Sequence, residues 1–230
     1  MLAGTGSDVG KSILAAAFCR ILKQDGYHPA PFKAQNMALN SYATPEGLEI
    51  GRAQAVQAEA AGVPCHTDMN PLLLKPSSEH TSQVVLLGKP IGDRNAYEYF
   101  RKEGREELRK VVNESYDRLA TRYNPIVMEG AGSISEINLR DVDLVNMPMA
   151  KHAGADVFLV ADIDRGGVFA SVYGSILLQT PEERSLIKGI IINKFRGDIR
   201  LFESGIKMIE DLCKVPVLSL IHISEPTRPY

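Results

Sequence analysis

The 230-residue sequence contains no tryptophan, only three cysteines and only five histidines. The cysteines (Cys19, Cys65 and Cys213) are odd in number, far apart and without a CxxC pair. This usage argues against a disulfide framework and is typical of reduced thiols in the cytoplasm. The histidines lack the spacing of a metal site, so the sequence does not indicate structural zinc.

Long apolar runs and basic tracts are also absent. No apolar run reaches the ~18 to 20 residues that a membrane-spanning helix needs, and no basic region followed by an apolar segment marks an export signal. Lys and Arg number 26 against 28 Asp and Glu, a formal net charge of −2. We therefore expect a cytoplasmic protein that binds neither membranes nor nucleic acid.

Hydrophobic residues make up 44% of the chain, enough for one large core. Short apolar runs rich in branched aliphatic residues alternate with segments of helical periodicity, as in parallel strands covered on both faces. The sequence therefore predicts an α/β fold with a doubly wound, mostly parallel sheet whose ligands bind beyond the carboxyl ends of the strands. The expected strands lie at residues 27–33, 81–88, 125–130, 155–164 and 188–195, and the expected helices at 12–26, 50–62 and within 92–123.

The chain begins with a glycine-rich segment, GTGSDVGKS (residues 4–12), directly before a helical pattern. Backbone N–H groups of such a loop converge on an anion, and the following helix adds the positive end of its dipole. Lys11 would face the outer phosphates and Ser12 would offer a hydroxyl to Mg²⁺. Five residues separate Gly4 from the Gly10–Lys11 pair, one more than usual. The segment predicts a variant phosphate-binding loop in a fold like that of P-loop nucleotide hydrolases.

Acidic residues near strand ends are candidates for the magnesium site that phosphoryl transfer requires. Glu129 follows an apolar strand and precedes Gly-Ala-Gly, where a ligand can approach the backbone closely. Glu49 lies where a helix begins, a position that an acidic residue also favours for its interaction with the helix dipole alone.

Two further strand ends carry polar residues. Asp162, Asp164 and Arg165 end one expected strand, just before two glycines. They could bind a phosphate or a carboxylate, although an aspartate at this position could equally cap the following helix. Asn193 ends the next strand, where related nucleotide enzymes hold the base.

Seven motifs occur together and in the order found in the cobyric acid synthase family, which the sequence resembles from about residue 4 to residue 218. The loop is also similar to the GTxxxVGK[ST] loop of dethiobiotin synthetase, which the synthetase portion of that family resembles. The motifs are FKAQNMALNS, EIGRAQ, DMNPLLLKP, SQVVLLGK, EGAGSISEINLRDVDLVNMPMA, ADIDRGGVFAS and GIIINKFRGD.

This resemblance implies an ATP- and Mg²⁺-dependent ligase of cobalamin biosynthesis. Such an enzyme activates side-chain carboxylates of the corrinoid adenosylcobyrinic acid a,c-diamide as acyl phosphates, which ammonia converts into amides. By the same resemblance, Lys11 and Lys33 are the catalytic residues and Ser12, Glu49 and Glu129 the metal ligands. The implied nucleotide-binding residues are Gly6, Ser7, Asp8, Val9, Gly10, Lys11, Ser12 and Asn193. The expected substrate-binding residues are Gln35, Asn36, Asn40, Asp162, Asp164 and Arg165.

Members of that family continue into a glutaminase domain with a Cys-His-Glu arrangement that supplies ammonia. We expect residues 1–218 to form the synthetase domain alone, without that domain and with its first strand truncated, since only three residues precede Gly4. The last residues, SLIHISEPTRPY (219–230), are expected to be a non-native tail. A homo-oligomer is left open.

Three alternatives remain. The first is another carboxylate-activating synthetase, such as dethiobiotin synthetase or the a,c-diamide synthase; the latter would show a Gly-Pro-Asp signature where this chain has KAQNMALN. The second is a partition-type ATPase switch, which would carry a further lysine at the position of Gly6 and a basic amphipathic membrane helix. The third is a fragment that does not fold stably, because each buried apolar side chain lost with a truncated strand costs about 1.5 to 3 kcal/mol.

Overall fold

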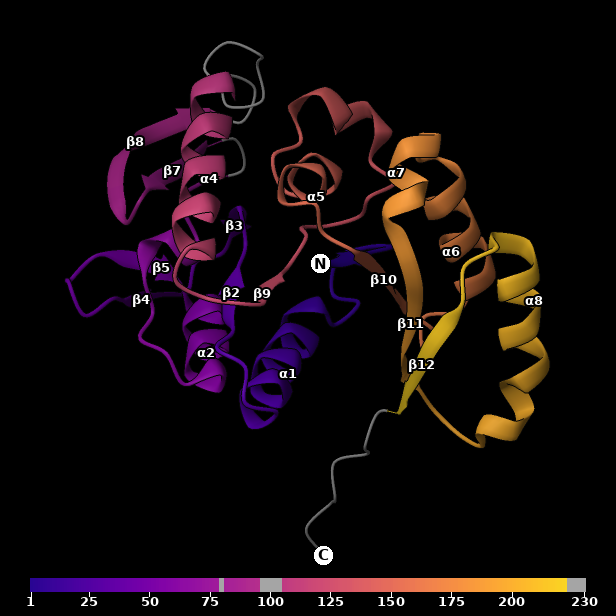
Figure 1. Ribbon diagram of the computed structural model, residues 1–230. Coiled ribbons are helices and arrows are strands. Elements are labelled where there is room, and N and C mark those ends of the chain that lie inside the picture. Colours follow the sequence, from indigo (N-terminus) through magenta and orange to yellow (C-terminus); the bar gives the residue numbers. More distant parts are fainter. Residues whose placement is uncertain (79–80, 96–104, 223–230) are drawn as a thin grey trace, which may run out of the picture.

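The computed structural model describes residues 1–78, 81–95 and 105–222, which form both strands and helices (Figure 1). The strands are β1 (Leu2–Gly4), β2 (Ala30–Phe32), β3 (Gln35–Met37), β4 (Ser41–Ala43), β5 (Glu49–Gly51), β6 (Leu72–Pro76), β7 (Thr81–Leu86), β8 (Lys89–Asn95), β9 (Ile126–Met128), β10 (Val157–Asp162), β11 (Ile187–Phe195) and β12 (Val217–His222). The α-helices are α1 (Lys11–Gln24), α2 (Arg52–Ala61), α4 (Arg105–Ala120), α5 (Met147–Ala153), α6 (Val168–Leu177), α7 (Pro181–Leu186) and α8 (Glu203–Cys213). Short 3-10 helices are η1 (Thr67–Met69), η2 (Ile137–Val142) and η3 (Ile199–Phe202).

The main sheet is parallel, as the sequence predicts. Strands β1, β10, β11 and β12 are neighbours in that order, and β2 pairs with β9. A parallel bridge between Leu2 and Glu129, with a 2.8 Å hydrogen bond from Gly130 N to Leu2 O, joins the two groups. The strand order therefore reverses between β9 and β1, and the carboxyl ends of these two strands border one crevice.

The core lies on both faces of this sheet. In Figure 1, β10–β12 run between α1 on one side and α6 and α8 on the other. Leu159, Val160, Ile190 and Ile192 in the central strands have no exposed surface. Burial on both faces explains why these strands read in the sequence as continuous apolar runs.

A second sheet, of order β3-β6-β7-β8, is not predicted from the sequence. The expected strand at 81–88 belongs to it as β7, antiparallel to both of its neighbours. Because short apolar runs do not reveal strand direction, the pattern could not separate this sheet from the main one. The prediction of a helical pattern from residue 92 is wrong at its start, since β8 extends to Asn95 and α4 begins at Arg105; residues 96–104 lie outside the described residues.

The sheet continues four residues past the boundary expected at residue 218. In β12, Ser219 pairs with Ile191, Leu220 with Ile192 and His222 with Phe195. Apolar residues, among them the β-branched Ile221, suit this strand, whereas the two prolines of the expected tail lie in 223–230, outside the described residues.

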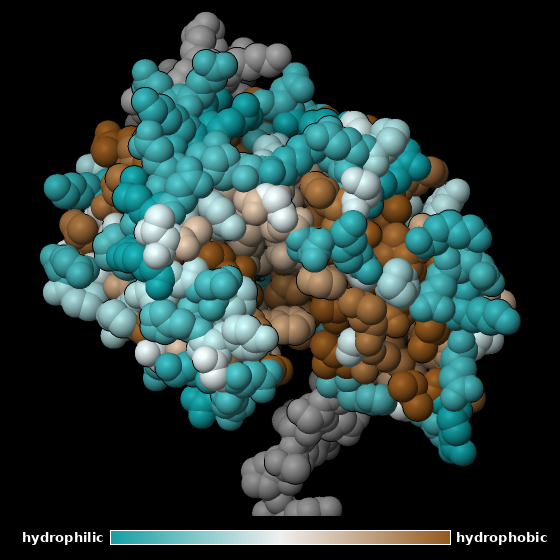
Figure 2. Space-filling model, viewed as in Figure 1, coloured by the Kyte–Doolittle hydropathy of each residue, from teal (hydrophilic) through white to brown (hydrophobic). Residues whose placement is uncertain are grey.

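Figure 2 shows apolar side chains gathered over β11 and β12. Within the described part of the chain, no helix has the length and apolar character needed to cross a membrane.

Candidate nucleotide-binding site

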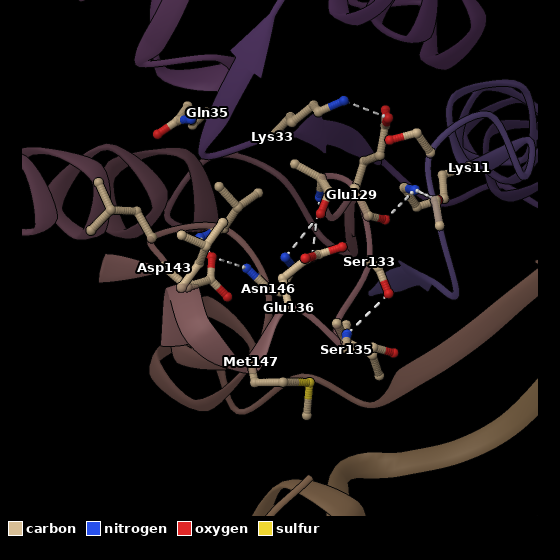
Figure 3. Close-up of a pocket in the computed structure, with 18 of the residues that line it drawn as sticks. Lys11, Lys33, Gln35, Glu129, Ser133, Ser135, Glu136, Asp143, Asn146 and Met147 are labelled. Carbon is tan, nitrogen blue, oxygen red and sulfur yellow. Dashed lines mark hydrogen bonds and ion pairs between the residues drawn. The ribbon is translucent and has the colours of Figure 1, made fainter. Parts of the chain in front are cut away.

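A pocket with a volume of about 930 Å³ lies at the carboxyl ends of β1 and β9. Its lining comes from the glycine-rich loop, from residues 33–37 after β2, from the segment 129–148 after β9, from Arg105 at the start of α4, and from Gln179 and Glu183. Figure 3 shows Lys11, Lys33 and Glu129 together at one end of this pocket, with Asp143, Asn146 and Met147 on the opposite wall. The position agrees with the crevice that the strand order creates.

The glycine-rich loop leads directly into α1. Gly10 precedes the helix with a φ of 105°, and a Cβ atom there would collide with the side-chain amide of Asn193. Glycine is therefore required at this position for both conformation and space. Asn193 Nδ2 donates to Val9 O at 2.8 Å, so this side chain supports the loop from β11 and does not line the pocket.

Lys11 is buried across the mouth of the loop. Its Nζ donates to Gly6 O at 2.8 Å and to Gly132 O at 2.9 Å. Burial, together with the neighbouring charge of Lys33, lowers the pKa of Lys11 to about 8, against the opposing effect of Glu129. Burial thus disfavours the charge of the ammonium, and an anion bound in the loop would compensate this cost.

The lowered pKa of Lys11 leads to a stability prediction. Below pH 8 the lysine is protonated in both the folded and the unfolded state, so the full cost of burying its charge is present. Between pH 8 and about 10.5 only the unfolded state binds the proton, and the free energy of unfolding rises with pH. We expect Lys11→Met to raise the free energy of unfolding at pH 7 by on the order of 2 kcal/mol, after allowing for the two carbonyls that lose their donor. Denaturant unfolding of both proteins should show this gain shrinking as pH rises through 8 to 10. A gain that is independent of pH would contradict the assignment.

Glu129 is the centre of the polar network, with only 2% of its surface exposed. Its Oε1 accepts hydrogen bonds from Ser12 Oγ and from Lys33 Nζ, each at 2.7 Å. Its Oε2 accepts from Gln57 Nε2 at 2.7 Å and from Gln54 Nε2 at 3.4 Å. The sequence prediction paired Glu129 with Ser12, and the structure brings these two side chains together.

The two glutamines of α2 were not predicted. Both are buried, and they lie three residues apart in a helix that otherwise presents alanines to the core. The signal that could have revealed them is a pair of polar side chains at helical spacing, on a helix face that otherwise carries small apolar residues.

The Ser12–Glu129 pair offers oxygen ligands of the kind that Mg²⁺ prefers. This cation binds through one or two carboxylates together with phosphate oxygens and water. Among the described residues no group of three or more His, Cys, Asp or Glu side chains could hold a metal by itself. Glu49, the third expected ligand, is not brought to this pair: its carboxylate forms a 2.6 Å ion pair with Lys75 and does not line the pocket.

The expected substrate-binding residues separate into two groups. Gln35 and Asn36 line the pocket beside Lys33. Asn36 Nδ2 donates to Gln54 Oε1 at 3.0 Å, which links this side of the pocket to the Glu129 network. Asn40 does not line the pocket; it is exposed, and its backbone oxygen accepts a hydrogen bond from Arg52 N.

Asp162, Asp164 and Arg165 do not line the pocket either. Asp162 Oδ2 accepts from Lys194 Nζ at 2.7 Å, its Oδ1 accepts from Asp164 N at 2.9 Å, and Arg165 Nε lies 3.6 Å from Oδ2. Lys194 also donates to Asp8 O at 2.6 Å. These residues support the outer side of the glycine-rich loop because β10 pairs with β1 on the side away from β9. Asp162 organises its own turn, in keeping with the alternative of a local capping role.

The opposite wall is formed by residues that sequence reasoning did not single out. Asn146 Oδ1 accepts from Ala131 N at 3.1 Å and its Nδ2 donates to Ala131 O at 2.9 Å. Asp143 Oδ1 accepts from the backbone N–H groups of Val145 and Asn146, while burial raises the pKa of its carboxyl group. Arg105 Nη2 donates to Val142 O at 2.5 Å. These contacts anchor the segment 129–148, which forms this wall of the pocket. In the sequence the segment stands out only as part of the motif EGAGSISEINLRDVDLVNMPMA.

Comparison with known proteins places this geometry in a family. A family model described as "CbiA: CobQ/CobB/MinD/ParA nucleotide binding domain" matches residues 1–227. Cobyric acid synthases of Bacteroides fragilis, Parabacteroides distasonis and Streptococcus sanguinis are 85%, 64% and 58% identical over 221, 222 and 221 residues, respectively. Each alignment covers 96% of this chain and 45%, 45% and 44% of those proteins, so the chain spans less than half of their length.

A solved structure has a similar fold. The signal recognition particle receptor FtsY from Elizabethkingia anophelis superposes with a TM-score of 0.54 at 16% identity, over 98% of this chain and 58% of the receptor. At this identity the likeness supports the fold alone. The resemblance to cobyric acid synthases and the doubly wound P-loop fold predicted from the sequence are both confirmed, and the chain belongs to the CobQ/CobB/MinD/ParA nucleotide-binding domain family.

Proposed function

We propose that the chain is the synthetase portion of a cobyric acid synthase, which uses ATP and Mg²⁺ to activate corrinoid carboxylates for amidation in cobalamin biosynthesis. The observation that supports this most directly is the convergence of Lys11, Lys33, Ser12 and Glu129 at one end of a pocket that extends beyond the phosphate loop. The identity of 85% to a protein named cobyric acid synthase supports the choice of substrate.

The cationic end of the pocket suits phosphoryl transfer to a carboxylate. The substrate carboxylate oxygen attacks the γ-phosphorus of ATP, the bond to the ADP oxygen breaks, and an acyl phosphate forms. Two anions must approach each other, and the Lys11 and Lys33 ammonium groups offset their repulsion. Mg²⁺ bound by Ser12 and Glu129 would add positive charge at the phosphates.

The corrinoid side chain would lie beside Lys33, in the part of the pocket that extends beyond the phosphate loop. Gln35 and Asn36 offer amide groups there, and the segment 131–148 forms the facing wall. Ammonia then attacks the acyl carbonyl carbon, phosphate leaves, and the nitrogen loses a proton to give the amide. The substrate supplies its own nucleophile in the first step, so no side chain of the protein needs to form a covalent intermediate.

The three cysteines are unsuited to releasing ammonia from glutamine. A glutaminase nucleophile is a thiolate with a lowered pKa, whereas burial raises the pKa of Cys19 to about 12 and also raises those of Cys65 and Cys213. We therefore expect this 230-residue chain to use ammonium and not glutamine as its nitrogen source.

This expectation can be tested with purified protein, ATP, Mg²⁺ and adenosylcobyrinic acid a,c-diamide. Amide formation, followed by mass spectrometry, should occur with ammonium chloride and be absent with glutamine alone. A control reaction without ATP should give no product. Equal amidation with glutamine would contradict the nitrogen-source prediction, and no ATP-dependent amidation with ammonium would contradict the proposed function.

A further inference from the structure

We propose that Gln57, assisted by Gln54, is a positioning residue that holds the Glu129 carboxylate in the orientation needed to bind Mg²⁺. The inference rests on the proposed function, because it assumes that Ser12 and Glu129 receive the cation. It assigns a role in the site to α2, although no residue of this helix lines the pocket.

The contacts of Gln57 connect the two proposed metal ligands. Its Nε2 donates to Glu129 Oε2 at 2.7 Å and to Ser12 O at 3.2 Å. One amide group therefore bridges the end of β9 and the first turn of α1. With Oε2 engaged in this way, Oε1 is the oxygen that faces Ser12 Oγ, at 2.7 Å.

Burial makes this arrangement specific. Gln57 and Gln54 are 1% and 0% exposed, in a helix whose other buried residues are alanines. Burying an amide costs free energy unless hydrogen bonds compensate it. Both hydrogen bonds that Gln57 Nε2 donates go to the residues of the proposed metal site, whereas Nε2 of another buried glutamine, Gln179, donates to the backbone oxygens of Ile134 and Ser175.

Loss of the Gln57 amide would leave Oε2 with the longer bond from Gln54 at 3.4 Å. The carboxylate would then be held mainly at Oε1, by Ser12 Oγ and Lys33 Nζ, and its plane could turn about that oxygen. Changes in the residues that orient metal ligands typically weaken metal binding by about 10- to 100-fold. The binding of ATP without a divalent cation does not require this orientation and should change little.

The test compares ATP affinity in Mg²⁺ and in EDTA, measured by calorimetry on the full 230-residue chain. For Gln57→Leu we expect the gain in affinity that Mg²⁺ provides to fall by about tenfold, with the affinity in EDTA within about twofold of the original protein. Ser115→Ala is the control: Ser115 is a fully buried polar side chain of α4 that does not line the pocket, so its loss should lower stability but keep the Mg²⁺-dependent gain. If Gln57→Leu does not fold, Gln57→Asn takes its place in the test. Asparagine keeps the amide but is too short to bridge Glu129 and Ser12, so we expect the same loss.

The outcomes separate the two proposals. If the original protein shows a Mg²⁺-dependent gain that Glu129→Gln removes, while a folded Gln57 variant keeps it, the positioning role is wrong and the proposed function stands. If the original protein shows no gain from Mg²⁺, the metal site assigned to Ser12 and Glu129 is wrong and the positioning role is overturned with it. An equal loss in Ser115→Ala would mean that the effect follows from general destabilisation, which also overturns the role of Gln57.

Discussion

Replacing Lys11 with alanine is expected to reduce ATP turnover by on the order of 10³-fold. The Lys11 ammonium lies at the mouth of the loop, bound to the backbone oxygens of Gly6 and Gly132. When a triphosphate replaces these weak acceptors, the buried cation gains a strong partner at the point where negative charge accumulates during transfer. The measurement is steady-state phosphate release with the corrinoid acid and ammonium present.

Two controls show that the effect of Lys11→Ala is local. The variant should remain folded, because removal of a desolvated charge does not weaken the core, and its thermal unfolding should stay cooperative. Lys23, an exposed lysine in the last turn of the same helix, provides the matched substitution, and Lys23→Ala should keep full turnover. If Lys11→Ala retained more than about a tenth of the original turnover, the loop would not bind the transferred phosphate as proposed.

Replacing Glu129 with glutamine is expected to lower turnover by about 10²-fold and to destabilise the fold. A neutral amide is a poor ligand for Mg²⁺. It also leaves the Lys33 ammonium, 2.7 Å from Glu129 Oε1 and 8% exposed, without its anionic partner. Uncompensated buried charges of this kind typically cost about 3 to 5 kcal/mol. Turnover and denaturant unfolding measured on the same preparation report the two effects.

A double variant separates these two roles of Glu129. Lys33→Met removes the orphaned cation, so the double variant Glu129→Gln with Lys33→Met should recover most of the lost stability. Turnover should not recover, because both proposed contributors to the phosphate site are then absent. Recovery of turnover together with stability would show that Glu129 acts only through folding.

The local parts of the site were readable in the sequence. GTGSDVGKS predicts the phosphate loop because glycine placement and the Lys-Ser pair act within one continuous segment, and the structure places Lys11 and Ser12 at the start of α1. The position of Glu129 after an apolar strand made it a candidate magnesium ligand, and the resemblance to the cobyric acid synthase family paired it with Ser12, beside which the structure places it. The same resemblance gave Lys33 its role, and the structure places this residue directly after β2.

Predictions were less successful where the side chain had a choice of partners. Glu49 was expected at the metal site but pairs with Lys75, and Asp162 was expected at the substrate but pairs with Lys194. A carboxylate near a strand end or a helix start can reach several cations, and the sequence does not indicate which one is nearest. The mixed sheet β3-β6-β7-β8 was missed because an apolar run carries no information on strand direction.

The sequence by itself determined the fold class, the phosphate loop and the family, because these depend on residues close together in the chain or on the order of motifs along it. Only the tertiary structure decided which side chains form the site around Glu129. Ser12, Lys33 and Gln57 come from three segments far from Glu129 in sequence, and their hydrogen bonds require that α1, α2, β2 and β9 pack against one another. Such contacts depend on the distance and direction between packed elements, which local patterns of residues do not encode.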